Sequence, residues 1–260
     1  MACHRLRHLA VVLVVLAVAC SLRADASDDP YGPLRPVCSL GAGYTSRSLY
    51  ETNLNRLFNK LSYEAVANGG FIINATEGDP KNMAFGVSMC FQDSNWADCI
   101  RCLDVAPSYA TRECPFNRTA ALLFSDCVVR YSDKNFFSEE TEEVASFELF
   151  VTVYLNSSAV VEARQAMLDK LVVEAVASEP LWAYGNTTHQ DGSRVYGLVQ
   201  CRRDLSKDHC NTCLTNLVGY VLRNFPNNTA ASFKSFNCYV NITEKYHSAK
   251  EKHVDVSNGV

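Results

Sequence analysis

The cysteine spacing C-x8-C-x2-C occurs twice in this chain, and it constrains the fold more than any other feature of the sequence. Residues 90–102 contain the first occurrence and residues 201–213 the second, 111 positions later. The same offset of 111 carries Cys127 onto Cys238. Further upstream in each copy, a gap of one residue changes the offset to 110. Further matches at 111 are Gly86 with Gly197, Leu103 with Leu214 and Tyr109 with Tyr220. The chain is therefore an internal duplication, in which each repeat is one structural unit.

The first 26 residues have the layout of a secretory signal peptide. A basic start precedes the apolar run 9–20, and the small residues Ala24 and Ala26 follow at the positions that a signal peptidase reads. A membrane span needs about 20 apolar residues, so this run is too short, and the tail 248–260 is polar. We expect export with cleavage near Ala26 and no membrane span.

Five segments follow from the repeat and the signal peptide. They are the signal peptide 1–26, copy one 27–136, a linker 137–141, copy two 142–247 and a polar tail 248–260. Removing residues 1–26 changes the net charge from −4 to −6, and this acidic balance argues against nucleic acid as a partner. The acidic residues Glu139, Glu140, Glu142 and Glu143 fall between the copies, where we expect a solvated segment.

The ten cysteines beyond residue 26 indicate a disulfide framework, because an even count in an exported chain is typical of one. Copy two lacks counterparts of Cys38 and Cys114, and this joint loss suggests that the two are partners in copy one. For the rest we prefer Cys90–Cys99 with Cys102–Cys127, and Cys201–Cys210 with Cys213–Cys238. The spacing leaves open Cys90–Cys102 with Cys99–Cys127.

The hydrophobic pattern predicts an α+β unit in each copy. Apolar residues recur at helical spacing from Ser48 to Asn68, and copy two repeats the pattern with Val160, Met167, Leu168, Leu171 and Ala175. A second helix is predicted from about Asn95, with a counterpart over 207–224. The stretches expected to form strands are 83–90, 120–131, 194–201 and 230–243. Each preferred bridge then joins the second helix to a strand.

Together these features closely resemble the ginkbilobin-homologous domain of plants, also called the salt-stress-response/antifungal domain. Two such copies after a signal peptide, over residues 30–136 and 142–247, resemble a cysteine-rich repeat secretory protein. The resemblance implies two helices on a five-stranded antiparallel sheet in each copy, an apoplastic location and the disulfide pairing preferred above.

Some members of that family bind mannose, and the resemblance places three sugar contacts on this sequence. The family has Asn, Arg and Glu there, whereas copy one has Ser39, Ala121 and Ser132. Copy two has Ser232 and Thr243 at the second and third positions. Because the guanidinium fork and the carboxylate are missing, we expect little mannose binding, and restoring the three residues should raise affinity if the pocket is otherwise intact. The residues of the true ligand site stay unknown.

Six Asn-x-Ser/Thr sequons predict glycosylation at the surface, at Asn74, Asn117, Asn156, Asn186, Asn227 and Asn241. No second pair of thiolate or imidazole ligands accompanies the C-x2-C pairs, so we expect no metal, no redox pair and no cofactor. The histidines 189, 209, 247 and 253 accompany no nucleophile motif, and Trp96 and Trp182 fit half-buried anchors better than sugar platforms.

The sequence therefore favours a secreted, non-catalytic binding protein of defence or stress response. Its partner would be an extracellular protein, with a receptor ectodomain as one option, or a cell-wall glycan. A glycan-binding antifungal protein is the alternative, and a hydrolase is the least favoured.

Overall fold

The computed structural model describes residues 31–41, 43–139, 147–154, 158–188, 194–226 and 228–243. The expected signal peptide and polar tail lie outside these ranges. So do residues 140 and 141 of the linker, the sequons at Asn156 and Asn227, and the histidines 189, 247 and 253. Among the described residues, no helix is long and apolar enough to cross a membrane.

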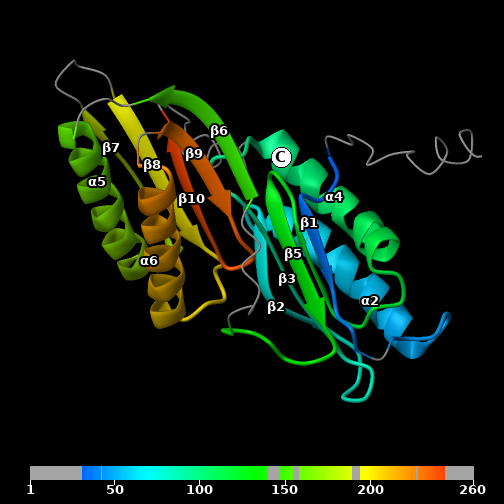
Figure 1. Cartoon of the computed structure of the whole chain (residues 1–260). Helices are drawn as coiled ribbons and strands as arrows, with labels where there is room; N and C mark the ends of the chain where they lie inside the picture. Colours follow the sequence, from blue (N-terminus) through cyan, green and yellow to red (C-terminus); the bar gives the residue numbers. More distant parts are fainter. Residues whose placement is uncertain are drawn as a thin grey trace, which may run out of the picture. The chain divides into compact units, whose positions relative to one another are not determined.

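Copy one forms helices on one side of a sheet (Figure 1). Its elements are β1 (Arg35–Cys38), α2 (Leu49–Asn59), the π-helical turn η1 (Lys60–Glu64), α3 (Ala65–Ala67), β2 (Phe71–Glu77), β3 (Ala84–Cys90), α4 (Trp96–Glu113), β4 (Ala120–Leu123) and β5 (Cys127–Ser132). The helix predicted over 48–68 is confirmed as α2, η1 and α3, and it begins at the Ser48 hydroxyl, which accepts from the Glu51 amide. Asn95 caps α4 in the same way, through the Asp98 amide.

Copy two repeats this arrangement. Its elements are β6 (Phe147–Tyr154), α5 (Ser158–Ala177), β7 (Trp182–Thr188), β8 (Arg194–Cys201), α6 (Lys207–Asn224), β9 (Asn228–Lys234) and β10 (Cys238–Thr243). The α6 bounds equal the predicted range 207–224, and Ser206 caps this helix by accepting from the His209 amide. In Figure 1, α5 and α6 lie next to each other along the β7–β8–β10 side of the sheet.

Each sheet has five antiparallel strands, with the orders β1-β4-β5-β3-β2 and β6-β9-β10-β8-β7. The stretches 120–131 and 230–243, which were expected as strands, each divide into two. The backbone reverses between Phe124 and Cys127 and between Ser235 and Cys238, where the first residue of each pair donates its amide to the carbonyl of the second at 2.9 Å. The α+β class with two helices on a five-stranded sheet per copy is confirmed.

The core of each copy lies between its helices and one face of its sheet. Gly86 and Gly197 mark the closest approach of the two layers. A β-carbon at Gly86 would lie 2.9 Å from Leu61 Cδ1, and one at Gly197 would lie 2.8 Å from Met167 Cε. A side chain at either position would require these leucine and methionine ends to move, so glycine allows the helix to pack closely against the sheet.

The opposite faces of the two sheets contact each other. The shared cluster contains Met89, Phe91, Ala121, Leu123 and Val128 from copy one and Leu198, Phe236 and Tyr239 from copy two. Within it the fully buried Gln200 accepts from the Gln92 amide at 2.9 Å and donates to the Cys90 carbonyl at 3.2 Å. The two copies thus form one packed body over residues 33–243, a feature the sequence analysis did not predict.

The described part of the linker is held by copy two. Arg202 donates to the Glu139 carbonyl at 2.7 Å, and the Ser138 carbonyl lies 2.9 Å from His209 Nδ1. The Ser138 and Glu139 side chains are exposed, as expected, but the backbone is fixed. Just before the linker, Phe136 is buried, and the guanidinium carbon of Arg130 lies 4.0 Å from the centre of the Phe136 ring. Burial, followed by the Arg202 charge, lowers the pKa of Arg130 to about 10.

Candidate functional site

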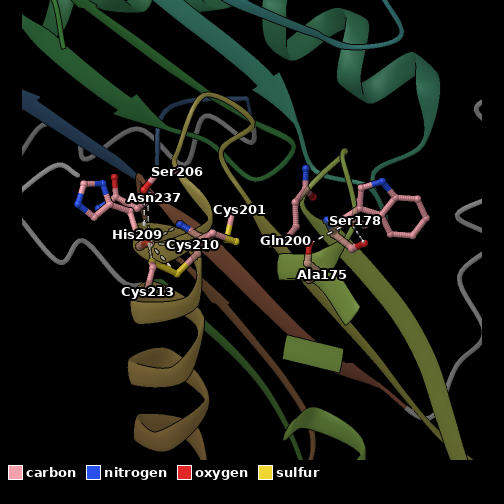
Figure 2. The surroundings of a disulfide bond; sticks show 12 residues. Ala175, Ser178, Gln200, Cys201, Ser206, His209, Cys210, Cys213 and Asn237 are labelled. Carbon is pink, nitrogen blue, oxygen red and sulfur yellow. Dashed lines mark hydrogen bonds between the residues drawn. A yellow bond between two sulfur atoms is a disulfide. The ribbon is translucent and has the colours of Figure 1, made fainter. Parts of the chain in front are cut away.

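Four of the five disulfides hold the first turns of α4 and α6, and the fifth joins β1 to the C-terminal end of α4. The structure pairs Cys38 with Cys114, Cys90 with Cys99, Cys102 with Cys127, Cys201 with Cys210 and Cys213 with Cys238. Figure 2 shows Ser206, His209, Cys210 and Cys213 at the start of α6, with Cys201 approaching from the end of β8. The pairs are those that the sequence analysis prefers, and all ten described cysteines are used.

This pairing separates the two cysteines of each C-x2-C motif. Cys210 is bonded to β8 and Cys213 to β10, so the two sulfurs clamp one helix to two strands. A redox pair would require a bond between the two sulfurs of one motif, and a zinc site would require free thiolates. Across the described ranges, no group of three or more metal-ligating side chains comes together. The C-x2-C motifs are structural.

Arg164 holds by hydrogen bonds a segment of copy two that corresponds to the one fixed in copy one by the Cys38–Cys114 disulfide. It is fully buried (0 % exposed) on α5, and it donates to the carbonyls of Phe225, Pro226 and Asn228. Phe225 occupies the position of Cys114, so the arginine ties α5 to the segment that the disulfide would have held. Phe225 also packs on Phe233, with ring centres 5.4 Å apart. Burial lowers the pKa of Arg164, because the charged guanidinium loses water.

An open pocket of about 670 Å³ lies at one end of copy one. The structure brings two of the three family sugar positions, Ser39 and Ser132, together in its wall. The Ser132 hydroxyl lies 2.9 Å from Thr119 Oγ1 and accepts from the Lys134 amide at 3.1 Å. The remaining lining residues are Gly41, Gly43, Arg118, Thr119, Asp133 and Lys134.

An ion pair forms the charged part of this pocket. Arg118 Nε lies 2.7 Å from Asp133 Oδ2, and the guanidinium sits 4.0 Å above the Tyr50 ring. The Tyr50 hydroxyl donates to the Arg118 carbonyl at 2.6 Å. Burial, followed by the Asp133 charge, raises the pKa of Tyr50, so the phenol stays protonated and acts as a donor. The sequence analysis missed Arg118 and Asp133, although Asp133 is adjacent to Ser132.

The rim of the pocket is apolar. Leu40 is fully exposed (105 %) between the lining residues Ser39 and Gly41, and Phe116 is 53 % exposed. The two segments pack together, because the Tyr44 amide donates to the Phe116 carbonyl at 2.9 Å. Phe116 has φ +59°, a conformation that is costly for a bulky residue. The copy-one pocket, as we call it, therefore combines a polar wall with exposed apolar side chains.

The third family sugar position lies elsewhere. Ala121 is 4 % exposed, on the sheet face that packs against copy two. An arginine there would meet copy two rather than a ligand, so the structure argues against including Ala121→Arg in a restored sugar site. In copy two the Ser232 hydroxyl donates to the Tyr239 hydroxyl at 3.4 Å, and Thr243 borders a small hollow beside Asp93.

The four described sequons differ in their surroundings. Asn74 and Asn186 are exposed, and Asn117 is half-buried beside Ser39. Asn241 is half-buried on the central strand β10, and its Nδ2 donates to Asp93 Oδ2 at 2.7 Å. That nitrogen is the atom to which a glycan is attached, so the structure argues against a glycan at Asn241.

Comparison with known proteins shows the family of the chain. The salt stress response/antifungal family matches residues 37–134 and 152–245. The chain is 34% identical over 185 residues to cysteine-rich repeat secretory protein 38 of Arabidopsis thaliana, covering 70% of this chain and 72% of that protein. It is 30% identical over 212 residues to an antimicrobial ginkbilobin-2-like protein of Castanea crenata, covering 82% and 85%.

A solved structure shares the fold. The tandem DUF26 ectodomain of the Arabidopsis thaliana cysteine-rich receptor-like protein PDLP5 superposes with a TM-score of 0.62 at 20% identity, covering 82% of this chain and 98% of that one. The duplicated cysteine spacing, the two five-stranded sheets and the family matches to both copies agree. The chain belongs to the salt stress response/antifungal family, with two tandem copies of its domain.

Proposed function

We propose that this chain is a secreted, non-catalytic binding protein of the apoplast, acting in defence or stress response, that engages an extracellular protein through the copy-one pocket and its rim. A receptor ectodomain is the partner that we favour. The domains are those stated above, with copy one over 27–136 and copy two over 142–247. The secreted relatives named above support the location.

The rim is the observation that carries this proposal. The two segments joined by the Tyr44–Phe116 hydrogen bond expose a leucine and a half-exposed phenylalanine, and the phenylalanine is held in a costly left-handed conformation. Apolar and aromatic side chains of this kind anchor protein interfaces, and polar groups around them set the register. The Arg118–Asp133 pair and the exposed Lys134 supply that polar surround.

The chemistry of the pocket supports a binding role over catalysis. Its carboxylate, Asp133, is engaged by Arg118, and its Ser132 and Thr119 hydroxyls bond to each other. The third hydroxyl, Ser39, donates to Asn117 Oδ1 at 3.4 Å. Among the described residues that line the pocket there is no histidine and no second carboxylate to activate a hydroxyl. A turnover assay on cell-wall polymers should therefore show no hydrolysis, and a rate that Asp133→Asn abolishes would overturn the non-catalytic role.

Biolayer interferometry against a panel of plant receptor ectodomains tests the protein-partner proposal. We expect saturable binding to at least one ectodomain, lost in a Leu40→Asp variant. The matched control is Val173→Asp, which changes an exposed apolar side chain on α5 of copy two, away from the pocket. Binding that Leu40→Asp leaves unchanged would contradict the assigned surface.

A glycan-binding antimicrobial role is the second candidate, and the name of the Castanea crenata relative favours it. A glycan array on the secreted protein separates the two. Calorimetry with mannose should show no saturable heat, because Ser39 and Ser132 are short and Ala121 is buried. If the protein binds a glycan on the array and binds none of the receptor ectodomains, the glycan-binding role becomes the favoured function.

A further inference from the structure

Asn186 occupies an unusual position for a sequon. It lies on β7, an edge strand of the copy-two sheet, in the sequence Asn186–Thr187–Thr188. Its side chain is exposed, and the β7–β8 register runs without a shift from Trp182 to Thr188. Side chains therefore alternate regularly along this strand, and residues two apart share a face.

Two tyrosines flank Asn186 on that face. Tyr184 precedes it by two residues, and Tyr196 on β8 is its direct partner across the strands. Directly opposed residues have their β-carbons about 4.5–5.5 Å apart. The two rings are nearly parallel, at 12° with centres 6.1 Å apart, and both are half-buried. Asn186 thus projects from a strand edge beside an aromatic surface made by these two stacked rings.

Such a surface suits the first sugar of an N-glycan. The C–H face of a pyranose ring is apolar, and aromatic rings provide a large, flat apolar area against which it can pack. We propose that Asn186 carries an N-linked glycan whose first N-acetylglucosamine packs on the Tyr184–Tyr196 pair and stabilises the edge of copy two. This inference is independent of the copy-one pocket.

The attachment chemistry is that of the secretory route. A lipid diphosphate-linked oligosaccharide transfers its glycan to Asn186, so that the C1–O bond to the diphosphate breaks and a bond from C1 to Asn186 Nδ2 forms. The amide gives up one proton, and the lipid diphosphate leaves. Thr188 supplies the hydroxyl that the sequon requires.

A structural need for this contact exists in copy two. Copy two has two disulfides where copy one has three. In the described part of the chain, β7 is also the last strand of its sheet, and proteins commonly cover or block such edges. A glycan held against the tyrosines would shield this edge as well as adding contacts.

Asn74 offers a matched control within the same chain. It is also an exposed sequon on an edge strand, β2, but it sits at a register shift with φ +60°. Its neighbour two residues earlier is the buried Ile72, and no aromatic side chain is paired with it in the register. A glycan at Asn74 therefore has no comparable ring pair to pack on.

The experiment uses the full chain secreted from a eukaryotic host that adds high-mannose glycans. Glycopeptide mass spectrometry should find Asn186 occupied. Trimming to one N-acetylglucosamine should leave the Tm unchanged, whereas Asn186→Gln should lower it by about 2–4 °C, the shift that one well-packed contact gives in a chain of this size. Asn74→Gln should leave the Tm unchanged. In a Tyr196→Thr background, Asn186→Gln should have no further effect.

Several results would overturn the proposal. They are an unoccupied Asn186, an equal loss of Tm with and without the Tyr196 ring, and a first sugar located in the open groove that Asn186 also lines together with Lys170 and Glu174 of α5. If Tyr196→Thr fails to fold, nuclear magnetic resonance on the wild type with a ¹³C-labelled glycan decides the matter. Ring currents should move the first sugar's proton resonances upfield at Asn186 and not at Asn74, and equal shifts at both sites would contradict the contact.

Discussion

Replacing Arg164 by methionine should destabilise copy two. Methionine keeps the aliphatic part of the side chain in the helix–sheet core but removes the donors to three carbonyls, those of Phe225, Pro226 and Asn228. The arginine therefore stabilises the segment of copy two whose counterpart in copy one is held by the Cys38–Cys114 disulfide.

The magnitude follows from the hydrogen bonds. Bonds from a charged donor contribute about 1.5–3 kcal/mol each. The favourable free energy of three such bonds is partly offset by the cost of keeping the guanidinium out of water, which amounts to several kcal/mol for a buried ion. The carbonyls left behind lose a partner in the variant, so we expect a net loss of about 2–4 kcal/mol.

The two tryptophans allow each copy to be followed separately. The chain has only two, Trp96 on α4 of copy one and Trp182 on β7 of copy two. In a Trp96→Phe background, urea unfolding monitored by fluorescence reports on copy two. For a slope of about 2 kcal/mol per molar urea, the midpoint should fall by about 1–2 M. In a Trp182→Phe background, where the fluorescence of Trp96 reports on copy one, Arg164→Met should lower the urea midpoint by less.

Arg164→Lys is the conservative control, because a single ammonium cannot span three carbonyls and should give an intermediate loss. An Arg164→Met variant with an unchanged or higher midpoint in the Trp182 signal would refute the reasoning. It would mean that water satisfies the carbonyls as well as the guanidinium does.

Four further outcomes follow from the same contacts. Non-reducing peptide mapping should link Cys38 to Cys114, and replacing both by serine should cost about 4.5 kcal/mol for a loop with a separation of 76 residues; a different partner for Cys38 would break the scheme. Glycopeptide analysis should find Asn241 unoccupied, since its Nδ2 is bonded to Asp93, and a glycan there would contradict the strand packing. Gly197→Ala should lower the unfolding midpoint because the methyl group would meet Met167, and an unchanged midpoint would show that the helix can shift. Burial raises the pKa of Tyr239, and Asp93 adds to the shift. The protonated phenol therefore stabilises the fold fully below about pH 10, and this stability is lost as the pH rises above that value, because the phenol of the unfolded chain ionises first. Titration at 295 nm should show a protected tyrosine until the protein unfolds, and an ordinary midpoint for all tyrosines would contradict this expectation.

The sequence analysis located the helices and the inner strands but missed β1, β2, β6 and β7. All four are edge strands. They carry features that weaken the alternating pattern, such as Pro36 in β1, the register shift at Asn74 in β2 and Gly185 in β7. Edge strands pair on one side only, so their composition is less constrained than that of central strands.

The candidate site was only partly predictable. Ser39 and Ser132 were found through the family resemblance, but the Arg118–Asp133 pair depends on two turns that only the fold brings together. Arg164 was overlooked because an arginine on an apolar helix face looks like a break in the pattern. Its alignment with Leu54 in copy one, at the 110-residue offset, was the available signal that it points inward. The contact between the sheets was hidden because the outward faces of both carry apolar residues that a single-copy analysis leaves unassigned.

Photo-cross-linking at the pocket rim tests the central claim most directly. A photoreactive amino acid at Leu40, and at Val173 as the control, would be introduced into the secreted protein and activated in the presence of the receptor ectodomain panel. Both side chains are exposed and apolar, and they lie on different copies. The proposed function predicts a covalent adduct with an ectodomain from position 40 and none from position 173. Equal labelling from both positions, or from neither while a glycan array shows saturable binding, would contradict a protein partner at the copy-one pocket.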